Sequence, residues 1–179
     1  MKPDTIHIAV RRIAAYGVDS ILILAWLGLL FLAVTTWSAG DYQVPASLFE
    51  KMRGHAIAFL TTTLPVWLYF TLLEASARGA TLGKQLLGLH VTTKIGDHLN
   101  FSRSALRSMV KFLPWEMSHM AIWYVPGRPF LDDMPLLNLT MSVAALVLVG
   151  TYIVMMFTGR GRTVYDLVTG TTISRRPRA

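Results

Sequence analysis

Three stretches of the chain contain no Asp, Glu, Lys or Arg over a length that could cross a lipid bilayer: residues 20–40, 55–73 and 134–159. A membrane-spanning helix needs roughly 17–25 mostly apolar residues. Of the 179 residues, 53% are hydrophobic and only 15% are charged, and the mean hydropathy is +0.47. A soluble domain carries about a quarter charged residues. The sequence therefore predicts one integral membrane domain over residues 1–179.

A fourth segment, at about 104–125, is less apolar and contains Pro114. With four crossings, 14 of the 17 Lys and Arg residues fall on one side of the membrane, whereas three crossings divide them 10 to 7. Because Lys and Arg concentrate in cytoplasmic loops, the count favours four helices with both termini in the cytoplasm. The predicted helices cover about 12–37, 55–75, 104–125 and 135–158. The third is expected to be short or broken at Pro114, since proline removes a backbone donor.

The polar segment 78–102 lies between the second and third predicted helices. Apolar or β-branched residues alternate with other residues over 89–93, residues 95–97 resemble a turn, and the alternation resumes over 99–101. Strands joined by a short turn have this pattern. The predicted fold class is therefore an all-α membrane protein with four transmembrane helices and a small cytoplasmic β-hairpin between helices 2 and 3.

Arg12 and Asp19 lie seven residues apart at the start of the first apolar stretch. Seven residues are two helical turns, a rise of ~10 Å, so Asp19 is expected inside the hydrocarbon. A carboxylate at that depth is a candidate functional group. It would be protonated, paired with a buried cation, or in contact with a bound cation or a water-filled cavity. Its candidate cationic partners are Arg12, Lys84, Arg107 and His119.

Other charges are expected near Arg12 at the inner ends of the helices. Glu74 ends the second span, and Arg162 and Asp166 follow the last one. One interpretation is a set of ion pairs that fixes how the helix ends pack. The other is that Arg12, Glu74 and Asp166 control the protonation of Asp19.

The segment 79–84 resembles a phosphate-binding loop, but it has one residue too few between its glycines. Gln85 also stands where Ser or Thr would bind magnesium. Nucleotide hydrolysis is excluded on this ground. The turn with Lys84 is still a candidate for holding a lipid phosphate.

Glu116 and His119 form a Glu-x-x-His pair, one helical turn apart. Di-iron bundles use two such pairs and two further Glu residues, so this chain lacks ligands for an intrachain site. We interpret the pair as a hydrogen-bonded polar patch, with an ion or proton path as the alternative and a membrane metalloenzyme as a third. His55, like the other remaining histidines, has no metal-ligand spacing.

Arg103, Arg107 and Lys111 recur every four residues and form a basic stripe on one helix face. Anionic lipid headgroups are their expected partners. No aromatic-rich basic module accompanies the net charge of +7, so nucleic acid is not an expected partner. The chain has no cysteine, which excludes disulfides and thiolate metal sites. We expect no enzyme activity, no cofactor and no metal site.

Three segments together resemble the RDD family of bacterial integral membrane proteins, named for one Arg and two Asp. They are Arg12 to Asp19, Gly79 to Val91, and Arg162 to Thr171, in which Asp166 matches the second Asp. The resemblance implies a multi-pass protein of the bacterial cytoplasmic membrane. Some family members are described as sodium/proton antiporters, although the function of most is unknown.

These observations lead to two hypotheses for the activity. The first is a small antiporter-like transporter of monovalent cations and protons, with Asp19 as the exchanging carboxylate and with Arg12, Glu74 and Asp166 around it. Lys84, Arg162, Glu116 and His119 are secondary candidates. Four helices are few for alternating access, so a homo-oligomer is expected. The second hypothesis is a non-transporting membrane scaffold, lipid-binding protein or assembly subunit.

Overall fold

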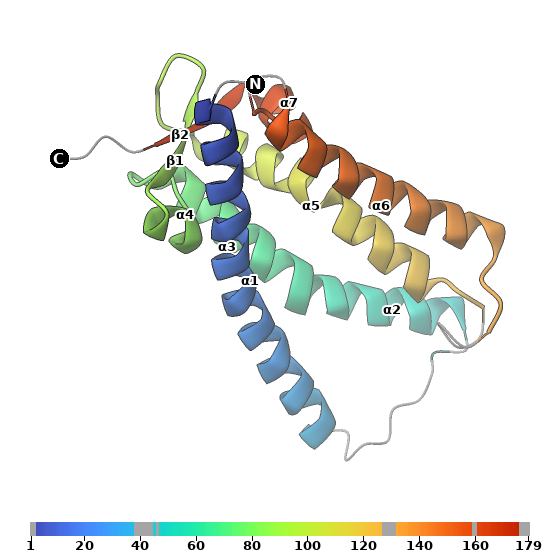
Figure 1. Cartoon of the computed structure of the whole chain (residues 1–179). Coiled ribbons are helices and arrows are strands. Elements are labelled where there is room, and N and C mark those ends of the chain that lie inside the picture. Colours follow the sequence, from blue (N-terminus) through green and yellow to red (C-terminus); the bar gives the residue numbers. More distant parts are fainter. Residues whose placement is uncertain (1–2, 38–44, 46, 127–131, 159–160, 176–179) are drawn as a thin grey trace.

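The computed structural model describes residues 3–37, 45, 47–126, 132–158 and 161–175. Within these ranges the chain is mostly helical (Figure 1). Five of the cations that entered the charge count lie outside the described residues: Lys2, Arg128, Arg160, Arg176 and Arg178.

Three helical rods are long and apolar enough to cross a membrane: Ile6–Trp37, Leu48–Ala75 and Leu136–Phe157. They correspond to α1 (Pro3–Trp37), to the continuous run of α2 (Leu48–Ala58), η1 (Phe59–Thr63) and α3 (Leu64–Ala75), and to α6 (Leu136–Phe157). This confirms the prediction of a largely helical membrane protein. The first and second helices begin earlier than the predicted residues 12 and 55.

The fourth predicted helix is present as α5 (Phe101–Trp123), which packs along α3 and α6 (Figure 1). It is not broken at Pro114, so this part of the prediction is wrong. Proline clashes with the carbonyl four residues earlier, here that of Val110. The Tyr152 hydroxyl of α6 donates to the Val110 oxygen at 2.7 Å, so a neighbouring helix satisfies this carbonyl.

The irregular turn lies instead in the second rod, where η1 is a π-helical turn. Pro65 follows this turn, and the carbonyl four residues before it belongs to Thr61. The indole nitrogen of Trp26 in α1 donates to that carbonyl at 2.9 Å. An aromatic donor from another helix thus satisfies the carbonyl opposite each of these two prolines.

The predicted β-hairpin is wrong. Strand β1 (Leu89–Thr93) pairs antiparallel with β2 (Thr171–Arg175) near the end of the chain, with Val91 opposite Ile173. The segment expected to form the second strand, residues 99–101, leads into α5 instead, because the Asn100 side chain accepts the Arg103 N–H at 2.9 Å and caps that helix. The helix cap outweighs the alternating pattern.

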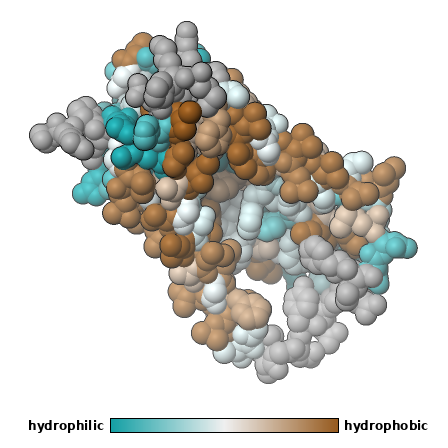
Figure 2. Space-filling view, viewed as in Figure 1, coloured by the Kyte–Doolittle hydropathy of each residue, from teal (hydrophilic) through white to brown (hydrophobic). Residues whose placement is uncertain are grey.

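The sheet sits at one end of the helices, together with α4 (Leu82–Leu86) and α7 (Val164–Thr169) (Figure 1). A small apolar core joins this end to α1: Ala15, Leu89, Val91, Leu99 and Ile173. From this end α1 diverges from the other long helices (Figure 1). Figure 2 shows hydrophobic residues along the helical rods and a hydrophilic group near the sheet.

Candidate functional site

Six charged side chains form a buried cluster at the end of the helices that carries the sheet. They come from α1, α3, α4, α5 and α7, and none is more than 8% exposed: Arg12, Glu74, Lys84, Arg107, Lys111 and Asp166. We call this set the buried charge cluster. It contains the two partners expected for Arg12, namely Glu74 and Asp166, and three cations that the sequence did not place with them.

Arg107 is the centre of the cluster. Its guanidinium donates to Glu74 of α3 and, at 2.6 Å, to Oδ1 of Asp166 in α7. Arg12 donates to the other oxygen of Asp166 at 2.9 Å. One arginine therefore links the second apolar rod to the C-terminal segment, and the other links that segment to α1.

Asp166 also forms the cap of its own short helix. Its Oδ2 accepts the backbone N–H of Thr163 at 3.0 Å and the Thr163 hydroxyl at 2.8 Å, which makes a capping box. Burial disfavours the charged carboxylate, but the guanidinium groups of Arg107 and Arg12 outweigh burial and hold the pKa of Asp166 well below its usual range. Asp166 is therefore an ionised structural anchor rather than a group that exchanges protons near neutral pH.

Glu74 is shared by three cations. Its Oε1 accepts from Lys84 and, at 2.8 Å, from Lys111, while its Oε2 accepts from Arg107. The Lys111 ammonium also lies 4.1 Å from the centre of the Phe70 ring, a cation–π distance. The cluster thus holds four basic side chains and two carboxylates. Because Glu74 pairs with three of the four, its loss should destabilise the cluster most.

The basic stripe on α5 does not face lipid headgroups as a unit. Arg107 is 0% exposed and Lys111 is 8% exposed, and both pair with carboxylates inside the protein. The headgroup interpretation is therefore wrong for these two residues. Arg103 is exposed and remains a candidate. The four-residue spacing identified one helix face correctly, but that face packs against α3 and α7.

Asp19 forms no ion pair within the described part of the chain. Its carboxylate accepts the Tyr69 hydroxyl at 2.7 Å, the Thr81 hydroxyl at 2.7 Å and the Gly83 N–H at 2.8 Å. It is 1% exposed. The candidate cations lie elsewhere, since Arg12, Lys84 and Arg107 pair with Asp166 or Glu74. Asp19 is a buried, hydrogen-bonded residue that attaches α4 to α1.

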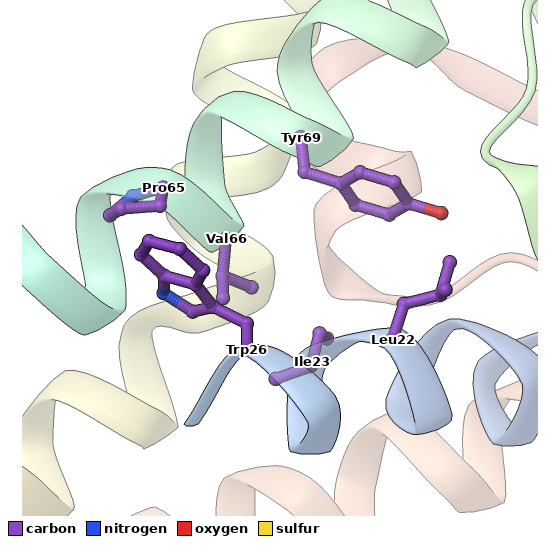
Figure 3. A pocket seen from close by; sticks show the side chains of 6 residues that line it. All are labelled: Leu22, Ile23, Trp26, Pro65, Val66 and Tyr69. Carbon is purple, nitrogen blue, oxygen red and sulfur yellow. The ribbon is translucent and has the colours of Figure 1, made fainter. Parts of the chain in front are cut away.

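An apolar cavity of about 200 Å³ lies beside this site, between α1 and α3 (Figure 3). Leu22, Ile23 and Trp26 line it from α1, and Pro65, Val66 and Tyr69 line it from α3. Asp19 does not line the cavity; Tyr69 contacts both. The cavity therefore offers no polar path for an ion to the carboxylate.

We predict that Asp19→Asn keeps the fold. The amide oxygen can accept from Tyr69 and Gly83, and the amide nitrogen can donate to Thr81, whose hydroxyl can reorient. Asp19→Ala leaves buried donors without acceptors and should cost about 1–3 kcal/mol. Thermal denaturation of both variants in detergent measures the difference. Equal, severe destabilisation by both changes would show that the negative charge itself is required.

Arg162 is partly buried and forms no ion pair among the described residues, so it does not belong to the buried charge cluster. Glu116 and His119 lie further along α5. Nine residues separate Glu116 from Arg107, which corresponds to about 14 Å along the helix.

Glu116 has partners from the second apolar rod. Its Oε1 lies 2.7 Å from Nε2 of His55, and its Oε2 accepts the Thr63 hydroxyl at 2.9 Å. His119 Nδ1 lies 3.8 Å from the same carboxylate and has no hydrogen-bond partner among the described residues. We call Glu116, His55, His119 and Thr63 the Glu116 site. Sequence spacing identified the Glu116–His119 pair but missed His55, because it lies 61 residues away in sequence.

The Glu116 site differs from the buried charge cluster in its access. The Glu116 side chain is 23% exposed and borders a cavity of about 380 Å³ between α3 and α5. Glu74 and Asp166 are fully buried. Among the described residues, no group of three His, Cys, Asp or Glu is arranged to hold a metal ion. The site is therefore a partly exposed carboxylate with an imidazole partner and an adjoining cavity.

Comparison with known proteins supports the reading of the three motif segments. Residues 8–170 match the profile of the RDD family. The chain belongs to the RDD family. Arg12, Asp19 and Asp166, which the motif resemblance matches to the Arg and the two Asp of the family name, here join α1 to α7 and to α4. No curated protein and no solved structure matches in the corresponding comparisons.

Proposed function

We propose that this RDD protein exchanges a cation for protons across the membrane, with Glu116 rather than Asp19 as the exchanging carboxylate. The observation that supports this choice is that Glu116 borders a cavity and contacts His55, whereas Asp19 is buried and hydrogen-bonded three times. An exchanging carboxylate must be reached by its ion, and the imidazole beside it can carry a proton. His119 would act as a second proton carrier.

In this proposal α5 is the fourth crossing. Its 23 residues correspond to about 34 Å, enough for a bilayer core. Arg107 and Lys111 pair with carboxylates of α3 and α7, and Glu116 contacts His55 and Thr63 of the second rod, so these charges are compatible with a span. The distribution of Lys and Arg supports cytoplasmic termini, and the family resemblance implies a bacterial inner membrane. The exposed far half of α1, including Phe31 and Trp37, leaves a surface for a homo-oligomer.

A non-transporting scaffold or assembly subunit is the second candidate. The observation that favours it is that the named family residues are all engaged in helix packing: Arg12, Asp19 and Asp166 bind other parts of the chain. In this case the Glu116 site would be only a polar contact between two helices.

Proton movement in liposomes separates the two candidates. With a pH-sensitive dye inside, addition of Na⁺, Li⁺ or K⁺ should release protons through the wild-type protein. Glu116→Gln should abolish this release, whereas Asp19→Asn should retain most of it. Glu50→Gln is the matched control, because Gln can replace Glu in the capping box of α2. Absence of exchange in the wild type would favour the scaffold. Full activity of Glu116→Gln would exclude Glu116 as the exchanging group.

A further inference from the structure

The cavity beside Glu116 combines an apolar wall with one acidic group. Phe59 and Trp67 line it from the second rod, and Met109 and Phe112 line it from α5. Glu116 and Thr63 are its polar members. At about 380 Å³ it falls within the range of sites that hold small organic ligands, roughly 300–1,000 Å³.

We infer that the Glu116 site binds a lipophilic organic cation, with its apolar body among the aromatic side chains and its charge beside the Glu116 carboxylate. This inference rests on the proposed function, since it names the class of cation that the site would exchange. Aromatic faces attract cations, and the attraction is stronger where water is excluded. A hydrated inorganic ion would gain nothing from the apolar wall, whereas a lipophilic cation uses both parts of the cavity.

The titratable groups around the Glu116 carboxylate allow a proton to compete with the cationic ligand. His55 of α2 contacts one oxygen of Glu116, and His119 lies near the other. The Tyr124 hydroxyl lies 3.3 Å from Nδ1 of His55, and the Lys51 ammonium is bound to the Val125 carbonyl at 2.5 Å. When His55 is protonated, it neutralises Glu116. When a cation arrives, the imidazolium releases its proton to water and the ligand takes its place beside the carboxylate.

The adjoining π-helical turn supports a site at this position. Thr63, the last residue of η1, donates to Glu116, and π-helical turns occur often at functional sites. Nδ1 of His119, which has no hydrogen-bond partner in the described part of the chain, is a further polar atom near the carboxylate. The π-helical turn and the His119 ring therefore both lie beside the carboxylate that borders the cavity.

Binding of tetraphenylphosphonium to the purified full-length protein in detergent tests the inference. This probe carries a permanent charge, so any pH dependence belongs to the protein. We expect saturable binding at neutral pH, measured by equilibrium dialysis, and about tenfold or greater weakening in Glu116→Gln. Glu50→Gln should bind as the wild type does. Met109→Trp, which fills the cavity from its exposed rim, should also weaken binding without any change of charge.

Two further binding measurements test the role of charge: the affinity for tetraphenylphosphonium as a function of pH, and the affinity for an uncharged analogue. Affinity for tetraphenylphosphonium should rise with pH in the wild type, because protons compete with the cation at Glu116, His55 and His119, and the rise should be smaller in His55→Gln. Triphenylphosphine oxide, which is uncharged, should not distinguish Glu116→Gln from the wild type. Equal binding of both probes, or unchanged cation binding in Glu116→Gln, would mean that the cavity is a groove for acyl chains and would overturn the inference.

The result of the binding experiment can be distinguished from the result of the liposome experiment. Cation-driven proton release with Na⁺ but no binding of tetraphenylphosphonium would overturn this inference and leave the proposed function in place. Binding that depends on Glu116, without proton release when Na⁺, Li⁺, K⁺ or tetraphenylphosphonium is added to the liposomes, would support the ligand class and exclude exchange.

Discussion

Replacement of Glu74 with Gln is expected to lower the free energy of unfolding by about 3–5 kcal/mol, the cost of leaving a buried ionic partner uncompensated. Glu74 is 0% exposed and accepts from Lys84, Arg107 and Lys111. Without its charge, Asp166 would be the only carboxylate left among four cationic side chains. Thermal denaturation in detergent, followed by size-exclusion chromatography, measures the loss.

Lys111→Met provides the contrasting variant. It removes one cation from a cluster in which cations outnumber carboxylates, and methionine packs well against the Phe70 ring. We expect a much smaller loss than for Glu74→Gln, and partial recovery when the two changes are combined. If Lys111→Met destabilises the protein as strongly as Glu74→Gln, the excess of cations is not what makes Glu74 essential.

Gly83→Ala is expected to have the second large effect, about 3 kcal/mol or more, because an added methyl group has no space. A Cβ at this position would lie 2.1 Å from the Ala15 carbonyl oxygen and 2.9 Å from Oδ1 of Asp19. The nearer contact is backbone of α1, which cannot rotate away. Helix α4 would have to move off α1, and Lys84 would then leave Glu74.

Gly150→Ala is the matched control for this change, because nothing lies within 4 Å of a Cβ built there in α6. It should be neutral or stabilising, as alanine favours helix more than glycine does. Thermal denaturation of both variants in the same detergent makes the comparison. Similar stability of the two variants would contradict the close packing of α4 on α1 on which our account of Asp19 depends.

These results would give the family motif a structural meaning. Arg12 and Asp19 point to different partners although they share one helix face: Arg12 reaches α7, and Asp19 reaches α4. The hydroxyls of Tyr69 and Thr81 complete the second contact. The motif then holds the short elements at the sheet end against α1, while Glu116 lies about 14 Å from Arg107 along α5.

Local sequence patterns predicted the parts of the fold that depend on local chemistry. Uninterrupted apolar length identified the three long rods, and the positions of Arg12, Glu74 and Asp166 at helix ends indicated that these charges lie together. Helix spacing also identified one face of α5. In each case the signal lies within a few helical turns of the chain.

Two predictions that the structure contradicts, the β-hairpin and the break at Pro114, failed because they depend on contacts between segments far apart in the sequence. Strand β1 pairs with β2, about 80 residues away, because the Asn100 cap commits the nearer segment to helix. Pro114 leaves α5 intact because Tyr152 satisfies the Val110 carbonyl. No local pattern contains either partner.

The sequence by itself determined a membrane protein of the RDD family, because apolar length and the three motif segments are properties of the chain. Only the tertiary structure decided which acid is enclosed and which is accessible. Asp19 is saturated by donors 50 to 64 residues away, and Glu116 borders a cavity beside His55. The physical reason is that burial and access depend on which helices pack together, and residue spacing does not encode them.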